Sequence, residues 1–140
     1  MTRLYPTDIA GFARKYRFGG GRVRRLGVRR RGEAVTLTLD LVVRRAVGGL
    51  GGEGGDPVRL RLRLEGVSEF RFQQRPGAGG GRISEARFGY FGDVYYVNLD
   101  AWGLAPGETP KLHDFRGSDA YAGARELFWE EVPPKGSAGQ

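Results

Sequence analysis

The chain has 140 residues, a length that suits one domain, and its net charge at pH 7 is +7. It contains no cysteine, so disulfides, zinc–thiolate sites, iron–sulfur clusters and thiol nucleophiles are excluded. Since no apolar run approaches the roughly 20 residues of a membrane helix and the N-terminus lacks a signal-peptide core, we expect one cytoplasmic domain over residues 1–132, a flexible tail over 133–140 and no membrane association.

Residues 6–17 predict a short helix, because Thr7 suits its cap and apolar residues follow at helical spacing. These apolar residues are Ile9, Phe12, Ala13 and Tyr16. Three glycines at 19–21 are expected to end the helix. Residues 22–31 then predict a strand, and its alternation slips near Arg24-Arg25, which indicates a β-bulge.

Residues 34–45 and 58–65 alternate apolar and polar side chains, a pattern typical of antiparallel strands with one buried and one hydrated face. A hairpin that matches these faces sets Leu41 beside Leu62 and Asp40 beside Arg63. It also places Arg44 near Arg59, an unfavourable like-charge pair. In this scheme Glu65-Gly66 turns the chain back, and residues 67–75 form a further strand with Phe70 and Phe72 opposite Leu62 and Leu60.

A second hairpin is predicted from residues 84–90 and 94–99 around Gly92-Asp93, with a type II′ turn. Its register pairs Tyr90 with Tyr95, Phe88 with Val97 and Ala86 with Leu99. Residues 103–117 are expected to form an irregular connection. Residues 120–132 fit both a helix and a strand, and the strand is favoured. The chain therefore predicts an α+β, mainly β fold: an N-terminal helix packed on a curved or partly barrelled antiparallel meander of about six or seven strands.

No recognisable catalytic or metal-binding motif is present, and no cofactor is predicted. His113 is the only histidine, so a metal site of several histidines is excluded and a conventional triad would depend wholly on this residue. None of the serines lies in a G-x-S-x-G motif, and a loop or capping role is expected for His113. Paired carboxylates leave a hydrolase as an alternative, with Glu85 and Asp100 as one candidate pair. Glu130 and Glu131 would point apart on a strand.

Arginine outnumbers lysine 20 to 3, and the basic charge is polarised along the chain. Residues 1–31 hold ten basic residues and one acid, whereas residues 88–140 hold four basic residues and eight acids. A GC-rich genome would explain the arginine excess but not its polarisation. A basic surface attracts phosphate-rich partners, and the polarity also permits head-to-tail self-association.

The candidate binding residues are arginines on the hydrated face of the predicted sheet. Under the predicted registers they form one stripe: Arg44, Arg59, Arg61, Arg63, Arg71 and Arg75. The arginines of residues 22–31 would extend it. Such a stripe binds phosphates through bidentate contacts. The alternative is a stripe neutralised by the acids of the C-terminal third, or one that is only solvated.

Four segments carry a resemblance that covers most of residues 20–132. They are the basic first strand, Leu64-Glu65-Gly66-Val67, Gly81-Arg82-Ile83 leading into Phe88-Gly89-Tyr90, and Ser118-Asp119-Ala120-Tyr121 through Leu127-Phe128-Trp129-Glu130-Glu131. In these patterns the chain resembles small uncharacterised bacterial α+β proteins, including some immunity proteins of bacterial toxin systems. The resemblance implies a protein-binding role without catalysis, although immunity proteins are often acidic and this chain is basic. It transfers no functional residue.

The function expected from the sequence is therefore a non-enzymatic binding or protein-interaction module. The alternatives are nucleic-acid binding through an arginine-rich sheet face and a carboxylate-based hydrolase.

Overall fold

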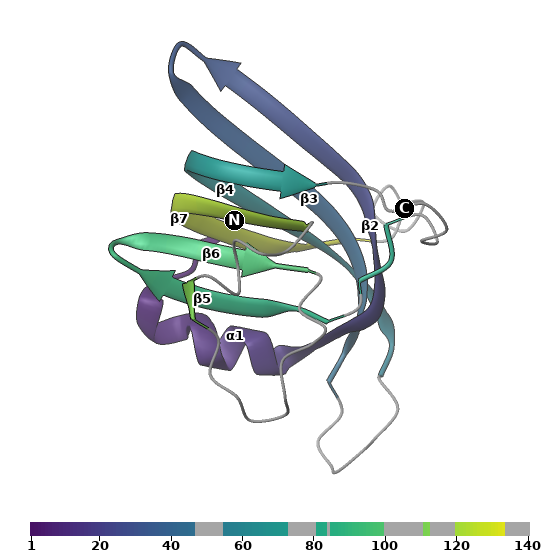
Figure 1. The fold of residues 1–140 in the computed structure, drawn as a ribbon. Helices are drawn as coiled ribbons and strands as arrows, with labels where there is room; N and C mark the ends of the chain where they lie inside the picture. Colours follow the sequence, from purple (N-terminus) through teal and green to yellow (C-terminus); the bar gives the residue numbers. More distant parts are fainter. Residues whose placement is uncertain (47–54, 73–80, 84, 100–110, 113–119, 134–140) are drawn as a thin grey trace.

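The computed structural model describes residues 1–46, 55–72, 81–83, 85–99, 111–112 and 120–133. Strand β1 (Thr2–Arg3) and a 3-10 turn (Pro6–Asp8) precede helix α1 (Ile9–Lys15). The remaining strands are β2 (Tyr16–Arg31), β3 (Ala34–Arg45), β4 (Pro57–Phe72), β5 (Arg87–Phe91), β6 (Val94–Asn98) and β7 (Ala120–Val132), as Figure 1 shows. Across these described ranges, the helices are too short and too polar to cross a bilayer.

The strands form one antiparallel sheet in the order β2-β3-β4-β7-β6-β5, with β1 paired to β7 beyond the end of β6. The predicted mainly β architecture, with its N-terminal helix and seven strands, is confirmed, and the sheet is not closed into a barrel. Strands β2, β3 and β4 follow one another as a meander, and β5 and β6 form a hairpin. The last strand, β7, lies between these two groups and joins them.

A dry layer of leucine and valine side chains forms the centre of the core. Leu37, Leu39, Leu62 and Leu64 are all 0% exposed, and they alternate with hydrated side chains along β3 and β4. Burying each such side chain contributes roughly 1.5–3 kcal/mol. The predicted strand over 34–45 is confirmed to the residue.

Helix α1 lies against the core face of the curled sheet through Phe12 (Figure 1). The Phe12 ring centroid is 5.2 Å from that of Trp129 and 5.4 Å from that of Phe88. Phe18 of β2 and Phe88 of β5 are themselves 5.2 Å apart, although their strands are the two ends of the sheet. The helix therefore packs where the curled sheet brings its two edges together.

The predicted register of β3 and β4 is wrong by two residues. Leu41 pairs with Leu60 and not with Leu62, and Asp40 pairs with Arg61 and not with Arg63. A shift by two residues leaves every side chain on its predicted face. The observed register sets Arg44 opposite Pro57, so the like-charge contact with Arg59 is avoided.

The predicted turn at Glu65-Gly66 is also wrong, because β4 continues through Gly66. Gly66 has φ +66° and precedes the register shift that lies between Val67 and Glu69 in the pairing of β4 with β7. A Cβ there would lie 3.1 Å from Cβ of Arg125, so a side chain at this position would be strained and crowded, and the strand continues through the glycine. As a result, Phe70 and Phe72 pair with β7 and do not oppose Leu62 and Leu60.

The second hairpin has the predicted register, with Tyr90 opposite Tyr95 and Phe88 opposite Val97, although its ladder ends at Arg87 and does not include Ala86. Its turn is not type II′, since Gly92 (φ 55°) and Asp93 (φ 64°) both have positive φ, as in type I′. Residues 120–132 form a strand, as predicted.

Two predictions at the start of β2 have different outcomes. The bulge near Arg24-Arg25 is confirmed, because the register shifts between Val23 and Arg25. The glycines at 19–21 do not end the helix, which stops at Lys15, and they lie inside β2. The predictions for residues 134–140 and for nearly all of 103–117 lie outside the described residues.

Replacing Leu62 with alanine should lower the free energy of unfolding by about 3 kcal/mol, because the lost transfer energy and the cavity cost add. The same change at Leu26, which is 37% exposed, should cost less than about 1 kcal/mol. Urea unfolding monitored by tryptophan fluorescence measures both values. Equal losses at the two positions would contradict a dry leucine layer as the source of stability.

Candidate functional site

A row of alternating charge crosses four strands on the outer face, the sheet face that points away from the core. In register these residues are Arg25 on β2, Asp40 on β3, Arg61 on β4 and Glu130 on β7. Arg61 Nε donates a hydrogen bond to Asp40 Oδ1 at 2.7 Å. Nη1 of the same arginine lies 3.7 Å from Glu130 Oε1. The hydrogen bond to Asp40 raises the pKa of Arg61. The central arginine of the predicted stripe is therefore neutralised from both sides.

Arg63, in the next row, lies beside an acid and an aromatic ring, but its buried Nε has no hydrogen-bond partner. Its Nε lies 3.4 Å from Glu65 Oε1, and its guanidinium carbon lies 4.8 Å from the centroid of the Phe128 ring. A guanidinium over an aromatic face at this distance is a cation–π contact. Arg61 and Arg63 are thus both engaged by neighbours within the sheet.

The other predicted stripe residues do not gather at one place. Arg44 donates to the Gly55 carbonyl oxygen at 3.1 Å, and Arg59 lies in register between Val42 and Val132. Arg71 lies near the far end of β4, with its guanidinium carbon 5.8 Å from the centre of the Tyr121 ring. Arg75 lies outside the described residues.

Strand β2 has more exposed arginines than any other described strand. Its exposed arginines are Arg17, Arg22, Arg24, Arg25, Arg29, Arg30 and Arg31. Of the β3 residues opposite them in register, Asp40 alone is acidic. The acids that form ion pairs with the arginines of β4 lie on β3, on β4 itself and on β7.

The outer backbone edge of β2 is covered over part of its length. Gly81–Ile83 contact it through hydrogen bonds from Gly20 N to Ile83 O, Ile83 N to Gly21 O and Val23 N to Gly81 O. From residue 24 to residue 31, this edge has no strand partner in the part of the chain that the structure describes. Charged side chains on an edge strand discourage edge-to-edge aggregation, which is one reason for arginines here.

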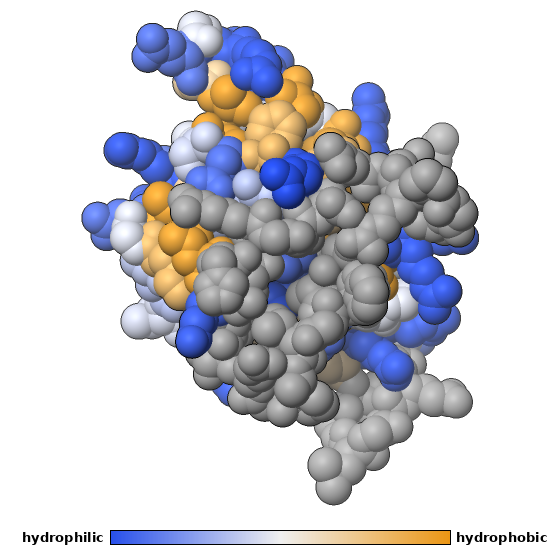
Figure 2. All heavy atoms as spheres, in the orientation of Figure 1, coloured by the Kyte–Doolittle hydropathy of each residue, from blue (hydrophilic) through white to orange (hydrophobic). Residues whose placement is uncertain are grey.

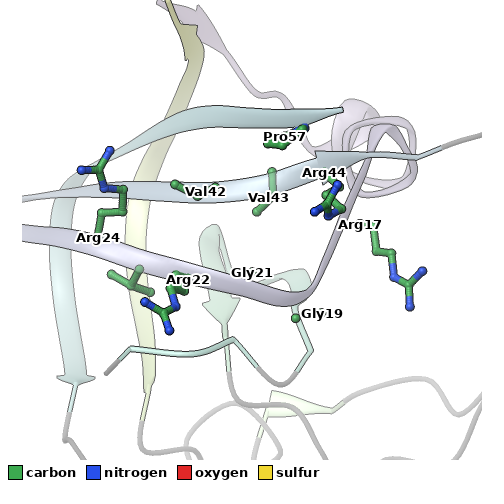
Figure 3. Close-up of a pocket in the computed structure, with 11 residues that line it drawn as sticks. Arg17, Gly19, Gly21, Arg22, Arg24, Val42, Val43, Arg44 and Pro57 are labelled. Atoms are coloured by element: carbon green, nitrogen blue, oxygen red, sulfur yellow. The ribbon is translucent and has the colours of Figure 1, made fainter. Parts of the chain in front are cut away.

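A hollow of about 890 Å³ opens on β2 where the strand bulges (Figure 3). Its lining is Arg17, Gly19, Gly20, Gly21, Arg22, Val23, Arg24, Val42, Val43, Arg44 and Pro57. We name it the arginine hollow. Four of these described lining residues are arginines and none is acidic.

Glycine is required for the shape of the arginine hollow. The pairing passes from Arg17 opposite Arg44 to Arg22 opposite Val42, so the intervening residues of β2 bulge out of the ladder. Gly20 has φ +86°, and a Cβ on Gly21 would lie 2.5 Å from the Val42 carbonyl oxygen. Sequence reasoning missed this site because it assigned the glycines to the end of the helix. The available signal was a glycine triplet flanked by arginines on both sides.

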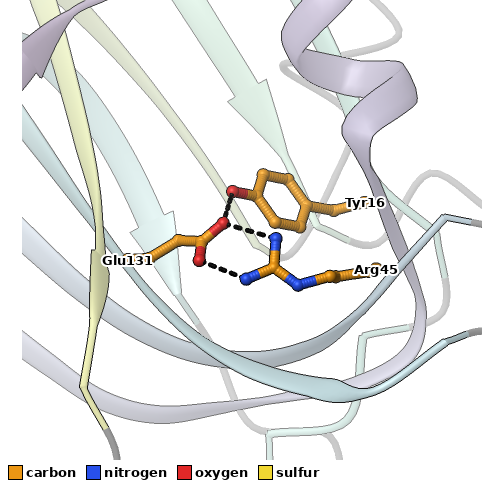
Figure 4. Close-up of polar contacts among 3 residues, drawn as sticks. All are labelled: Tyr16, Arg45 and Glu131. Atoms are coloured by element: carbon orange, nitrogen blue, oxygen red, sulfur yellow. Dashed lines mark hydrogen bonds and ion pairs between the residues drawn. The ribbon is translucent and has the colours of Figure 1, made fainter.

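On the core side of the sheet, Tyr16, Arg45 and Glu131 join three strands (Figure 4). The Tyr16 hydroxyl donates to Glu131 Oε2 at 2.5 Å, and Arg45 donates to both carboxylate oxygens, at 2.9 and 2.5 Å. The hydrogen bond from Arg45 lowers the pKa of Glu131 most, and the hydrogen bond from Tyr16 lowers it further. Burial, followed by the contact with Glu131, raises the pKa of Tyr16. The cluster has the geometry of a structural clamp that ties β2, β3 and β7 together.

The carboxylates considered for hydrolysis are separated. Glu131 belongs to the clamp and Glu130 pairs with Arg61 on the outer face, so the two point apart as predicted. Glu85 forms an ion pair with Arg87, and its proposed partner Asp100 lies outside the described residues, as does His113. Within the described ranges, no group of three or more acids and histidines is placed to hold a metal ion.

Comparisons with family models, with curated proteins and with solved structures found no match for this chain. The resemblance to small bacterial α+β proteins therefore stays a prediction.

Replacing Glu131 with glutamine should destabilise the protein more at pH 7 than at about pH 3. The lowered pKa of Glu131 in the folded state means that its stabilisation is present above the unfolded value of about 4.3 and is lost as the pH falls through the folded value. Thermal unfolding of both proteins across this range measures the difference. Glu33→Gln removes the same charge from an exposed residue between β2 and β3, and it should change stability little at either pH. A Glu131→Gln effect that does not vary with pH would contradict the clamp.

Proposed function

We propose that this protein is a non-enzymatic binding module that takes up an acidic, extended segment of a partner protein along the edge of β2. One observation carries the proposal: the strand with the most exposed arginines is also the strand whose backbone edge is open from residue 24 to residue 31 among the described residues. Such a partner would share the compartment of the protein, which the sequence predicts to be the cytoplasm.

An added strand would find matching chemistry on both faces of β2. Arg25, Arg29 and Arg31 lie on the outer face, opposite Asp40, Thr36 and Ala34. Leu26 and Val28 lie on the core-side face and are 37% and 45% exposed. Figure 2 shows hydrophobic residues at the surface near the projecting end of the β2–β3 hairpin, with hydrophilic side chains around them.

This alternation defines the partner segment. Main-chain hydrogen bonds supply affinity when a strand is added to a sheet edge, and alternate side chains supply specificity. Acidic side chains of the segment would lie beside the arginines, and apolar side chains would lie beside Leu26 and Val28. A segment that alternates acidic and apolar residues satisfies both faces at once.

A second copy of β2 fits this edge poorly. Pairing two such strands would place arginines of one copy beside arginines of the other, and like charges directly opposite are destabilising. The basic edge therefore repels a second copy of β2, whereas it attracts an acidic strand. The head-to-tail self-association predicted from the sequence would need an acidic partner surface elsewhere on the chain.

Nucleic-acid binding through the predicted stripe has less support from the geometry. Arg61 and Arg63 are already engaged by carboxylates within the sheet. Proteins that bind single strands combine basic grooves with aromatic rings for base stacking. The aromatic residues of β2, Tyr16 and Phe18, are buried in the core and do not present their rings on the outer face.

A synthetic peptide of alternating glutamate and valine should bind the protein at about 50 mM salt, and more weakly as salt rises, because exposed ion pairs are screened. The double variant Arg29→Gln/Arg31→Gln should weaken this binding about threefold to tenfold, since each exposed pair contributes roughly 0.2–1 kcal/mol. Fluorescence anisotropy of the labelled peptide measures both effects.

Two controls separate strand addition from general charge attraction. Arg14→Gln/Arg125→Gln removes the same charge from exposed positions on α1 and β7 and should leave peptide affinity within about twofold. Methylating alternate backbone amides of the peptide should abolish binding without changing its charge. Equal binding of the methylated peptide, or a single-stranded oligonucleotide that binds far more tightly than the peptide, would overturn the proposal.

A further inference from the structure

We infer that the arginine hollow is a separate site for a small ligand with two or more linked phosphoryl groups, of the nucleoside di- or triphosphate or inorganic polyphosphate class. It differs from the strand-binding edge in position, since it lies on residues 17–24 of β2 and on the adjoining end of β3. Its volume of about 890 Å³ falls in the range of small-molecule and cofactor pockets, roughly 300–1,000 Å³.

A like-charge pair lies beside the glycine bulge. Arg22 stands opposite Arg82 in an isolated bridge. Like charges placed directly opposite each other across strands are destabilising. An anion bound between them would relieve this repulsion and would itself be held by charge-assisted hydrogen bonds.

The chemistry of the lining favours phosphoryl oxygens. Guanidinium groups are planar forks of donors that bind phosphate through paired hydrogen bonds. No carboxylate lies among the described lining residues to compete for them. Gly19, Gly20 and Gly21 carry no side chains, so a ligand can come close to the backbone of the bulge.

The spacing of the arginines favours more than one phosphoryl group. In Figure 3, Arg22 and Arg24 lie towards one end of the hollow, and Arg44 lies towards the other. Their guanidinium groups do not converge on a single point. A single phosphate would therefore meet one group of arginines, whereas a linked chain of phosphoryl groups would reach both.

Isothermal titration calorimetry at low salt with ATP, tripolyphosphate and inorganic phosphate tests the inference. ATP and tripolyphosphate should each bind at least tenfold more tightly than inorganic phosphate, because they alone span the hollow. Equal affinity for ATP and tripolyphosphate would identify a polyphosphate site, and tighter binding of ATP would identify a nucleotide site. Either result supports the inference, and inorganic phosphate binding as tightly as tripolyphosphate would overturn it.

The double variant Arg22→Gln/Arg24→Gln should weaken the binding of ATP and of tripolyphosphate at least tenfold. Arg29→Gln/Arg31→Gln removes the same charge from the same strand beyond the hollow and should weaken the binding of both ligands less than about twofold. Amide shifts in ¹H–¹⁵N spectra provide a second measurement, since ligand should perturb Gly19, Gly20 and Gly21 in the unaltered protein. Equal losses in the two variants, or no shift at these glycines, would overturn the site. Because the acidic peptide depends on the other pair of arginines, failure here is distinguishable from failure of the proposed function.

Discussion

The dry layer formed by alternate leucines and valines of β3 and β4 is the constraint on which the rest of the structure depends. Once Leu37, Leu39, Leu62 and Leu64 face the core, the intervening residues of both strands must face water. That alternation places Arg61 beside Asp40 on the outer face of the sheet. Arg25, Arg29 and Arg31 of β2 lie on the same face. The outer surface is therefore a direct consequence of how the core is buried.

The elements could be predicted from local sequence because alternation and turn residues are local signals. The strand over 34–45, the hairpin at Gly92-Asp93 and the strand over 120–132 depend on such signals. Pairing depends on information that local patterns do not contain. Any even shift between β3 and β4 keeps the leucines buried, and both registers set an arginine beside Asp40. The observed register differs in setting Arg44 opposite Pro57, away from Arg59. Gly66 was misassigned because a glycine marks a turn and a bulge equally well.

The candidate site shows the same division between local and distant information. Arginine was the right residue type and the hydrated face the right face, but the arginines of β4 are compensated by Asp40 and by Glu130, which lies far along the chain. The largest group of exposed arginines on any described strand is instead on β2, at the edge of the sheet. The arginine hollow was missed because it requires three glycines inside a strand, where they would ordinarily weaken it.

The position of β7 has a consequence for how the chain assembles during synthesis. It pairs with β1, β4 and β6, all of which precede it, so they emerge from the ribosome before their common neighbour exists. Until then β4 and β6 each present an unpaired edge, and Leu62 and Leu64 lack the side chains of β7 beside them. The β2–β4 meander and the β5–β6 hairpin therefore cannot form one sheet until β7, which joins them, has been synthesised.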